Sequence, residues 1–151
     1  MRQIREKCSD CGVESNARFG ESDSGWPRSL AHWRSFHCCA CGSRYEADGA
    51  GPLPDELRTI ELAEGGIWCL SLDNVSLESL NELRVVLVLG LPELAQVKAC
   101  AGREILFGTE WEVRRISSAL SDRGVSVTLS SGEPTNGLFN IRDVWRTLLA
   151  R

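Results

Sequence analysis

The chain has 151 residues, of which 42% are hydrophobic and 25% are charged, which is the composition of a folded, soluble protein. No apolar run approaches the roughly 20 residues that are needed to cross a bilayer, and the N-terminus lacks the apolar stretch of a secretory signal. We therefore expect a cytoplasmic protein that has no membrane partner.

The charge is divided unevenly along the chain. Residues 1–45 carry seven Lys and Arg against five Asp and Glu, a net charge of +2, whereas residues 46–151 carry ten against sixteen, a net charge of −6. The overall charge of −4 argues against a general nucleic-acid binder, because counterion release rewards a basic surface. We therefore expect a protein partner rather than nucleic acid.

Two copies of the motif Cys-x-x-Cys-Gly stand near the N-terminus, and five of the seven cysteines precede residue 42. The two-residue spacing lets both sulfurs of a turn face one cation, and the glycine that follows relieves crowding as the chain reverses. Two such turns supply the four tetrahedral thiolates that zinc prefers. The sequence therefore predicts one structural zinc ion per chain, bound by Cys8, Cys11, Cys38 and Cys41.

His37 and Cys39 are the alternative ligands, although Cys39 stands one residue too close to Cys41 for the usual turn. The alternatives to a metal are a disulfide pair or unrelated buried thiols. Four thiolates leave no open coordination position, so we expect the metal to hold the fold rather than to activate water. The sequence also lacks the common phosphate-binding, dinucleotide-binding, metalloprotease and serine-hydrolase motifs, and we expect no enzyme.

Aromatic residues and arginines are concentrated between the two motifs, in a stretch otherwise rich in glycine and serine: Phe19, Trp26, Arg28, Trp33, Arg34 and Phe36. Tryptophan and arginine dominate binding hot spots, which makes Trp26, Arg28, Trp33 and Arg34 candidates for contact with a partner. Trp26 and Arg28 flank a proline in a predicted turn and are the pair expected to be exposed. The alternative for Trp33 is packing within a small core that needs large side chains.

Glycine and proline interrupt every periodic pattern over residues 48–54. This break predicts a zinc-ribbon module over residues 1–52 and a small α/β domain over residues 53–151. Within the second part, residues 66–72 are predicted as a strand. Ser76 is the predicted cap of a helix that ends at Gly90.

The remaining elements follow from their end signals and their apolar spacing. Pro92 suits the first turn of a short helix that runs toward Cys100. The best-marked helix begins at Thr109, where Thr109 and Glu112 form a capping box, and it stops at Gly124. Alternation predicts a half-buried strand over residues 125–130. A terminal helix, which we expect to dock on the core, carries one apolar stripe: Ile141, Val144, Trp145, Leu148 and Leu149.

The doubled motif is followed by Tyr-Glu-Ala-Asp-Gly at residues 45–49 and by Pro-Leu-Pro-Asp-Glu-Leu at residues 52–57. This combination, over about the first 60 residues, resembles the double-CXXCG family of bacterial immunity proteins. The resemblance implies a protein that protects a cell from a toxin delivered by its neighbours.

A second resemblance covers about residues 66–130, where Leu-Gly-Leu-Pro-Glu at residues 89–93 and the apolar pattern from Val113 to Val127 look like the C-terminal domain of the ribosomal stalk protein. The implied fold is a small α/β sandwich in which helices cover a short sheet. Pro92 and Ala95 stand where the stalk carries lysines, so only its fold is carried over.

These observations predict an α+β chain that acts as a cytoplasmic immunity protein and inhibits a cognate toxin domain by stoichiometric binding. The contact would be the Trp/Arg segment or the acidic C-terminal face, where Glu110 and Asp122 lie on the outer side of a helix. A basic toxin would suit the −6 charge of residues 46–151. The alternative is a zinc-ribbon adaptor that contacts nucleic acid or the translation machinery.

Overall fold

The computed structural model describes residues 1–23, 30–100, 103–135 and 138–149; within these ranges it does not describe the side chains of residues 23, 30 and 147–149. The described part is an α+β protein, as the sequence predicted, and it has two four-stranded sheets and five helices. The chain divides into two compact units, Met1–Leu57 and Arg58–Arg151. Across the described ranges, no helix combines the length and the apolar character that a membrane span requires.

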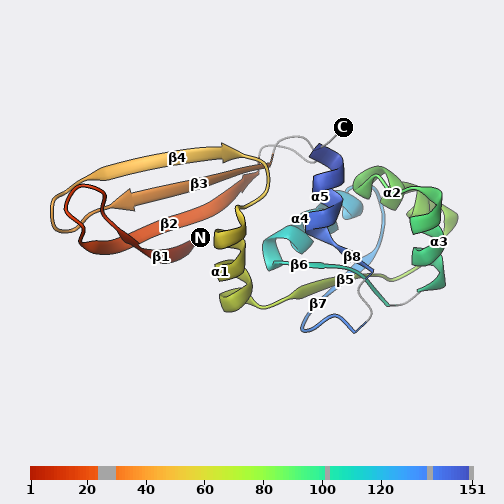
Figure 1. The fold of residues 1–151 in the computed structure, drawn as a ribbon. Helices are drawn as coiled ribbons and strands as arrows, with labels where there is room; N and C mark the ends of the chain where they lie inside the picture. The colour runs from red at the N-terminus through yellow and green to blue at the C-terminus, as the bar shows by residue number, and fades with distance from the viewer. Residues whose placement is uncertain (24–29, 101–102, 136–137, 150–151) are drawn as a thin grey trace. The chain divides into compact units, whose positions relative to one another are not determined.

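The N-terminal unit is an antiparallel sheet in which each strand pairs with its neighbours along the chain (Figure 1). The strands are β1 (Arg2–Lys7), β2 (Glu14–Asp23), β3 (Leu30–His37) and β4 (Arg44–Ala50). One Cys-x-x-Cys-Gly motif joins β1 to β2, and the other joins β3 to β4. Both turns therefore lie at the same end of the sheet, as Figure 1 shows.

The two turns repeat one local structure 30 positions apart. Gly12 donates its N–H to the carbonyl of Cys8 at 2.9 Å, and Gly42 donates to the carbonyl of Cys38 at 3.1 Å. Both glycines are left-handed, with φ of +74° and +76°. A side chain would strain this backbone, and the glycine after each cysteine pair is therefore a requirement of the turn.

The two faces of this sheet differ in composition. On one face Ala17 and Phe36 are buried together with Cys8 and Cys38, and Ile4 packs against them. On the other face most side chains of β1 and β2 are polar and exposed. Because successive residues of a strand point to opposite faces, this alternation gives the sheet one packed side and one side that meets solvent.

The C-terminal unit has a second sheet, which follows helix α1 (Asp55–Gly65). Its strand order is β7-β5-β6-β8, with bounds β5 (Trp68–Leu72), β6 (Glu104–Gly108), β7 (Val127–Ser131) and β8 (Phe139–Asn140). Strand β5 pairs antiparallel with β6 and with β7, whereas β8 runs parallel to β6.

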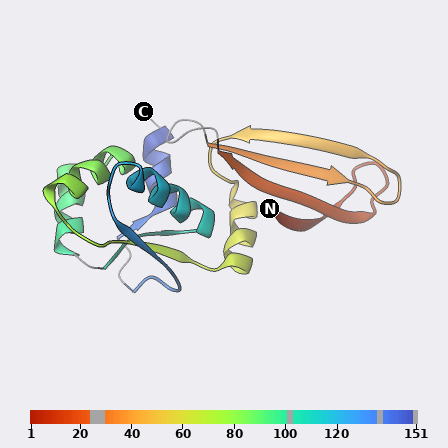
Figure 2. The ribbon, with the colours of Figure 1, turned by 180° about the vertical axis from the view of Figure 1, so that it is seen from behind.

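Four further helices accompany this sheet: α2 (Leu77–Leu87), α3 (Leu91–Ala99), α4 (Glu110–Ser121) and α5 (Ile141–Leu149). Helix α4 packs across β5, β6 and β7, and α5 packs against β6 and β8 (Figures 1 and 2). Helix α2 contacts both α3 and α4. The buried apolar side chains of this unit include Leu70, Leu72, Leu83, Leu87, Val97, Ile105, Leu106, Val113, Ile116, Leu120, Ile141 and Trp145.

The helix starts predicted at Ser76 and Thr109 are confirmed. The Ser76 hydroxyl accepts the N–H of Ser79 at 3.0 Å. The Thr109 hydroxyl accepts the N–H of Glu112 at 3.2 Å, and the Glu112 carboxylate accepts the N–H of Thr109 at 2.8 Å. Each cap satisfies backbone donors that have no partner inside the first turn.

The predicted end of α2 at Gly90 was wrong, because the helix ends at Leu87. Val88 follows in the left-handed conformation, with φ of 54° and ψ of 43°, and Gly90 caps the N-terminus of α3 instead. A β-branched residue is rarely found in this region of φ and ψ. Gly90 does lie between the two helices, but it is the N-cap of α3 and not the end of α2.

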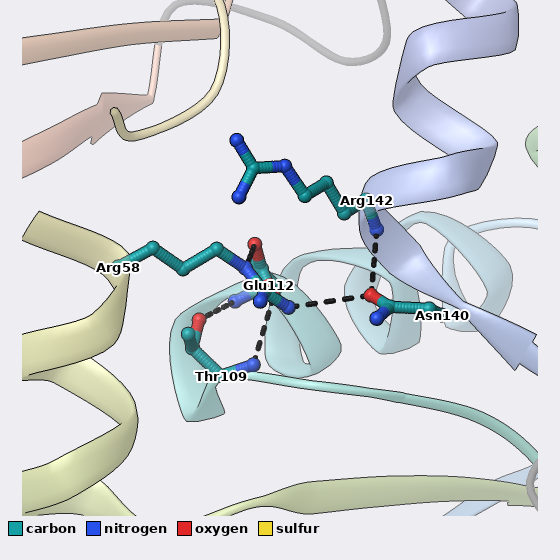
Figure 3. Close-up of polar contacts among 5 residues, drawn as sticks. All are labelled: Arg58, Thr109, Glu112, Asn140 and Arg142. Carbon is teal, nitrogen blue, oxygen red and sulfur yellow. Dashed lines mark hydrogen bonds and ion pairs between the residues drawn. The ribbon is translucent and has the colours of Figure 1, made fainter. Parts of the chain in front are cut away.

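A buried ion pair connects α1 to α4 in the C-terminal unit (Figure 3). Arg58 donates from Nε and Nη2 to the two carboxylate oxygens of Glu112, at 2.9 and 3.0 Å. It also donates to the side-chain oxygen of Asn140 at 3.3 Å, which in turn accepts the N–H of Arg142. A Cβ at Gly108 would lie 2.4 Å from a Glu112 oxygen, so only glycine leaves room for this carboxylate.

Candidate metal centre

The sulfur atoms of Cys8, Cys11, Cys38 and Cys41 all lie within 4.8 Å of one another. The Sγ atoms of Cys8 and Cys41 are 3.6 Å apart, and those of Cys11 and Cys38 are 3.5 Å apart. Tetrahedral coordination at a metal–sulfur distance of about 2.3 Å places neighbouring sulfurs about 3.8 Å apart. A disulfide would bring two of them to about 2.05 Å. The four cysteines therefore fit one metal ion.

Each hairpin contributes one buried and one exposed thiol to this cluster. Cys8 and Cys38 directly follow strands β1 and β3 and are buried, whereas Cys11 and Cys41 lie in the turns and are exposed. The pairs of close sulfurs join residues of different hairpins. A bound ion would therefore tie the first hairpin to the second at the end of the sheet where both turns lie.

The turns also affect the ionisation of the thiols. The backbone N–H groups of Cys41 and Ala40 lower the pKa of the Cys38 thiol to about 6, against the opposing effect of its desolvation. The Ser43 N–H lowers the pKa of Cys41, but the sulfurs of Cys38 and Cys11 raise that pKa to about 12. Four thiolates this close repel one another unless a cation lies among them, so metal binding must release protons.

The two alternative ligands lie outside the sulfur cluster. The thiol of Cys39 lies 3.3 Å from the hydroxyl oxygen of Ser15, which accepts the Cys39 N–H at 3.2 Å. His37 is exposed and lines the same surface hollow as Cys39. The structure thus brings together the four motif cysteines and places His37 and Cys39 on the other face of the sheet.

Of the four predicted partner-binding residues of the N-terminal unit, the structure describes Trp33 and Arg34. Trp26 and Arg28 lie outside the described residues. Trp33 and Arg34 are neighbours on β3 and point to opposite faces, with the Trp33 indole against Gly20, where a Cβ would approach it to 3.0 Å. The Nε of Arg34 donates to Glu6 at 3.1 Å, so the Arg34 guanidinium takes part in an ion pair within the sheet.

The predicted acidic contacts lie at the two ends of α4. Glu110 forms an exposed ion pair with Arg114 at 2.8 Å, and Asp122 is the exposed residue that ends the helix. The structure keeps both carboxylates at the surface. Neither lies close in sequence to the metal cluster, which belongs to the N-terminal unit.

An apolar hollow of about 360 Å³ lies on the C-terminal unit and was missed from the sequence. Its lining combines the connection between α2 and α3 with β8 and α5: Leu87, Val88, Leu89, Gly90, Glu93, Leu138, Phe139, Asn140, Asp143 and Val144. Val85 and Leu91, just outside this connection, are 54% and 72% exposed. The hollow depends on elements about 50 residues apart in the sequence, so no local pattern could have indicated it.

Comparison of the chain with protein-family models, with curated proteins and with solved structures finds no match.

Proposed function

We propose that the chain is a zinc-stabilised immunity protein, which neutralises a toxin domain in the cytoplasm by binding it one to one. The observation that carries this proposal is the cluster of four sulfur atoms within 4.8 Å of one another. Four thiolates complete the tetrahedral coordination of zinc and leave no position for water or a substrate. A metal held in this way stabilises a binding scaffold and does not take part in a reaction.

The resemblance of the first 60 residues to the double-CXXCG immunity proteins supplies the class of partner. The proposal includes the finer description of the fold as well: a zinc ribbon over residues 1–52, and a small α/β sandwich over residues 53–151 on which the terminal helix docks. The burial of Ile141, Val144 and Trp145 on α5 supports the docking of that helix.

The apolar hollow of the C-terminal unit is the surface that best suits a protein partner. Its walls include Val88, Leu89 and Phe139, and Glu93 and Asp143 lie among them. Interface cores are apolar and are surrounded by polar residues, and an acidic surface favours association with a basic partner. The net charge of −6 over residues 46–151 also favours association with a basic partner.

The test is a titration of protection. The protein is expressed in increasing amounts together with a candidate toxin chosen from the neighbouring genes, and cell survival is measured against the ratio of the two proteins. Survival should saturate near one molecule of this chain per toxin molecule. Protection by much smaller amounts would indicate an enzyme that reverses the damage and would overturn the proposal.

The proposed contact surface has a matched pair of variants. Leu91→Glu changes a residue that is 72% exposed beside the hollow, whereas Leu77→Glu changes one that is 77% exposed at the start of α2. The start of α2 lies about 15 Å along the helix from its end at the hollow. Leu91→Glu should weaken the complex at least about tenfold, and Leu77→Glu should leave it unchanged. Equal effects would show that the toxin binds elsewhere.

A further inference from the structure

The exposed face of the N-terminal sheet carries a row of hydrogen-bond donors that crosses all four strands. Arg5 on β1 lies opposite Asn16 on β2, and His37 on β3 lies opposite Arg44 on β4. The pairing of Ala17 with Phe36 brings Asn16 and His37, the next residue on each strand, beside one another. We call Arg5, Asn16, His37 and Arg44 the donor row. With strands about 4.8 Å apart, it extends over about 14 Å.

A hollow of about 490 Å³ adjoins the donor row. Its lining consists of Gln3, Arg5, Glu14, Ser15, Asn16, Arg18, Ser35, His37 and Cys39. No aliphatic or aromatic hydrocarbon side chain is among them, and guanidinium, imidazole, amide and hydroxyl groups dominate. Such groups are donors for oxyanions, so the hollow suits an anionic ligand.

The cations on this face form no ion pair within the described residues, although the carboxylate of Glu14 lines the hollow beside them. Within the described ranges, the side chains of Arg5, Lys7, Arg18 and Arg44 have no ion-pair or hydrogen-bond partner. By contrast, five arginines elsewhere form ion pairs with carboxylates: Arg34, Arg58, Arg114, Arg123 and Arg146. The four cations without a partner outnumber the three carboxylates that alternation places on the same face, Glu14, Glu46 and Asp48, so the face is weakly positive on a chain whose net charge is −4.

We propose that the donor row and its hollow bind the phosphate backbone of a single-stranded nucleic acid. Arginine, lysine, asparagine, glutamine and serine are the side chains that contact phosphates in nucleic-acid complexes. An acidic protein surface fits less well, because protein interfaces have apolar cores and this lining has none. This surface belongs to the N-terminal unit. Binding of nucleic acid there would be an additional activity, which does not depend on the neutralisation of a toxin.

Trp33 favours a single-stranded nucleic acid over a duplex as the ligand. Its side chain lies on the same face as Ser35 and His37, because the three residues alternate along β3. The indole rests against Gly20 and is half-buried, so one part of it stays accessible. Unstacked bases stack on aromatic side chains of this kind, while the backbone follows a cationic groove. A duplex keeps its bases stacked and could use only the cations.

The test is fluorescence anisotropy with the full chain, carrying its metal, and a labelled oligothymidine of about a dozen nucleotides. We expect a micromolar Kd that rises steeply with salt. The double variant Arg5→Gln/Arg18→Gln should weaken binding at least about tenfold and reduce the slope of log K against log salt by about 1.4, since each lost phosphate contact contributes about 0.7.

The matched control is Arg84→Gln/Lys98→Gln, which removes the same charge from exposed positions of the C-terminal unit. It should leave the affinity unchanged. Trp33→Ala should weaken binding of the oligonucleotide by about fivefold or more, with the metal content as the check on folding. Trp33→Phe keeps a stacking surface and should restore most of the affinity.

Three results would overturn the inference. The first is no binding of the oligonucleotide at about 100 µM protein, far above the expected range. The second is an equal loss of affinity in the control double variant, which would show an effect of net charge alone. The third is tighter binding of a polyaspartate peptide or of a duplex than of the single strand, which would assign the face to a different ligand. The toxin titration has no part in these measurements.

Discussion

The two units of this chain are stabilised in different ways. One buried cluster of the N-terminal sheet consists of Cys8, Ala17, Phe36 and Cys38, with Ile4 beside it, so two of its members are ligands of the proposed metal. Phe19 on β2 is buried as well. The C-terminal unit buries leucine, isoleucine, valine and tryptophan side chains from four helices and its sheet. A bound metal would add stability to a small sheet that buries limited apolar surface, whereas a unit with a larger core has less use for one.

The difference extends to the charged residues. The C-terminal unit places one ion pair, Arg58 with Glu112, in its interior and satisfies it with further hydrogen bonds. The N-terminal sheet leaves Arg5, Arg18 and Arg44 on its surface. When a metal stabilises a sheet from one end, packing does not determine which residues occupy the solvent-exposed face of that sheet. That face is then available for recognition.

Removal of the metal should have the largest effect and should affect the N-terminal unit alone. Cys38→Ser breaks the tetrahedral set, and structural zinc contributes about 10–16 kcal/mol in small zinc modules. We expect metal analysis to find one zinc per wild-type chain and little in the variant. The NMR signals of residues 1–50 should collapse, while those of the C-terminal unit persist.

Cys39→Ser is the control for the choice of ligands, because the Cys39 thiol lies beside Ser15 and outside the cluster. Its zinc content should match the wild type. If the Cys39 variant lost zinc, the assignment of ligands would be wrong. Loss of the C-terminal signals in Cys38→Ser would show that the two units do not fold independently.

Trp145→Ala tests the apolar core of the C-terminal unit, whose stability should not depend on the metal. Trp145 is 1% exposed and meets Trp111 edge-on at 6.2 Å between ring centroids. Its truncation should destabilise the C-terminal unit by about 3–5 kcal/mol and leave the zinc content intact. Arg146→Ala, at an exposed position on the same helix, should change the melting temperature little. An unchanged melting curve for Trp145→Ala would mean that α5 is not part of the core.

Glu112→Gln tests the buried ion pair. Glutamine can keep the capping box at Thr109, so the change isolates the lost charge beside Arg58. A buried charge without its partner costs about 3–5 kcal/mol. Glu110→Gln breaks the exposed pair with Arg114 on the same helix and should cost about 0.3–0.5 kcal/mol by chemical denaturation. Similar losses in both variants would contradict the burial of this pair.

Asp73→Asn should have the smallest effect, and it should depend on pH. The hydroxyls of Ser126 and Thr128 donate to Asp73 and lower its pKa. A carboxyl group with a lowered folded-state pKa stabilises the fold above its unfolded pKa of about 3.9, and this contribution is lost as the pH falls through the folded-state value. The variant should therefore melt below the wild type at pH 7 and approach it near pH 3. A constant difference would contradict this account.

Local signals in the sequence predicted the helix starts but not the full sheets. The caps at Ser76 and Thr109 and the proline in α3 depend on residues within one turn, so they could be read directly. Strand β6 and helix α1 were missed, although the acidic residues Asp55 and Glu56 after Pro54 are a helix-start signal. Strands of the N-terminal hairpins carry too many charged residues for an apolar alternation to stand out.

The candidate sites also differ in whether local signals in the sequence could predict them. The cluster of four cysteines was predictable because the spacing of each pair is a local property of its turn. The donor row was not, since Arg5 and Arg44 are brought into line only by the register of four strands. Arg34 was predicted to contact a partner, yet it pairs with Glu6, 28 positions away. Which arginines are exposed without a partner is a tertiary property.

Val88 has a consequence for how this protein tolerates mutation. Its left-handed backbone costs roughly 1–2 kcal/mol that glycine would avoid. Val88→Gly should therefore emerge as a general second-site suppressor, which rescues unrelated damaging substitutions in the C-terminal unit. The same side chain lines the apolar hollow, and its removal would widen the surface proposed for the toxin. Selection for protection should then favour valine at a position where selection for robustness alone would favour glycine.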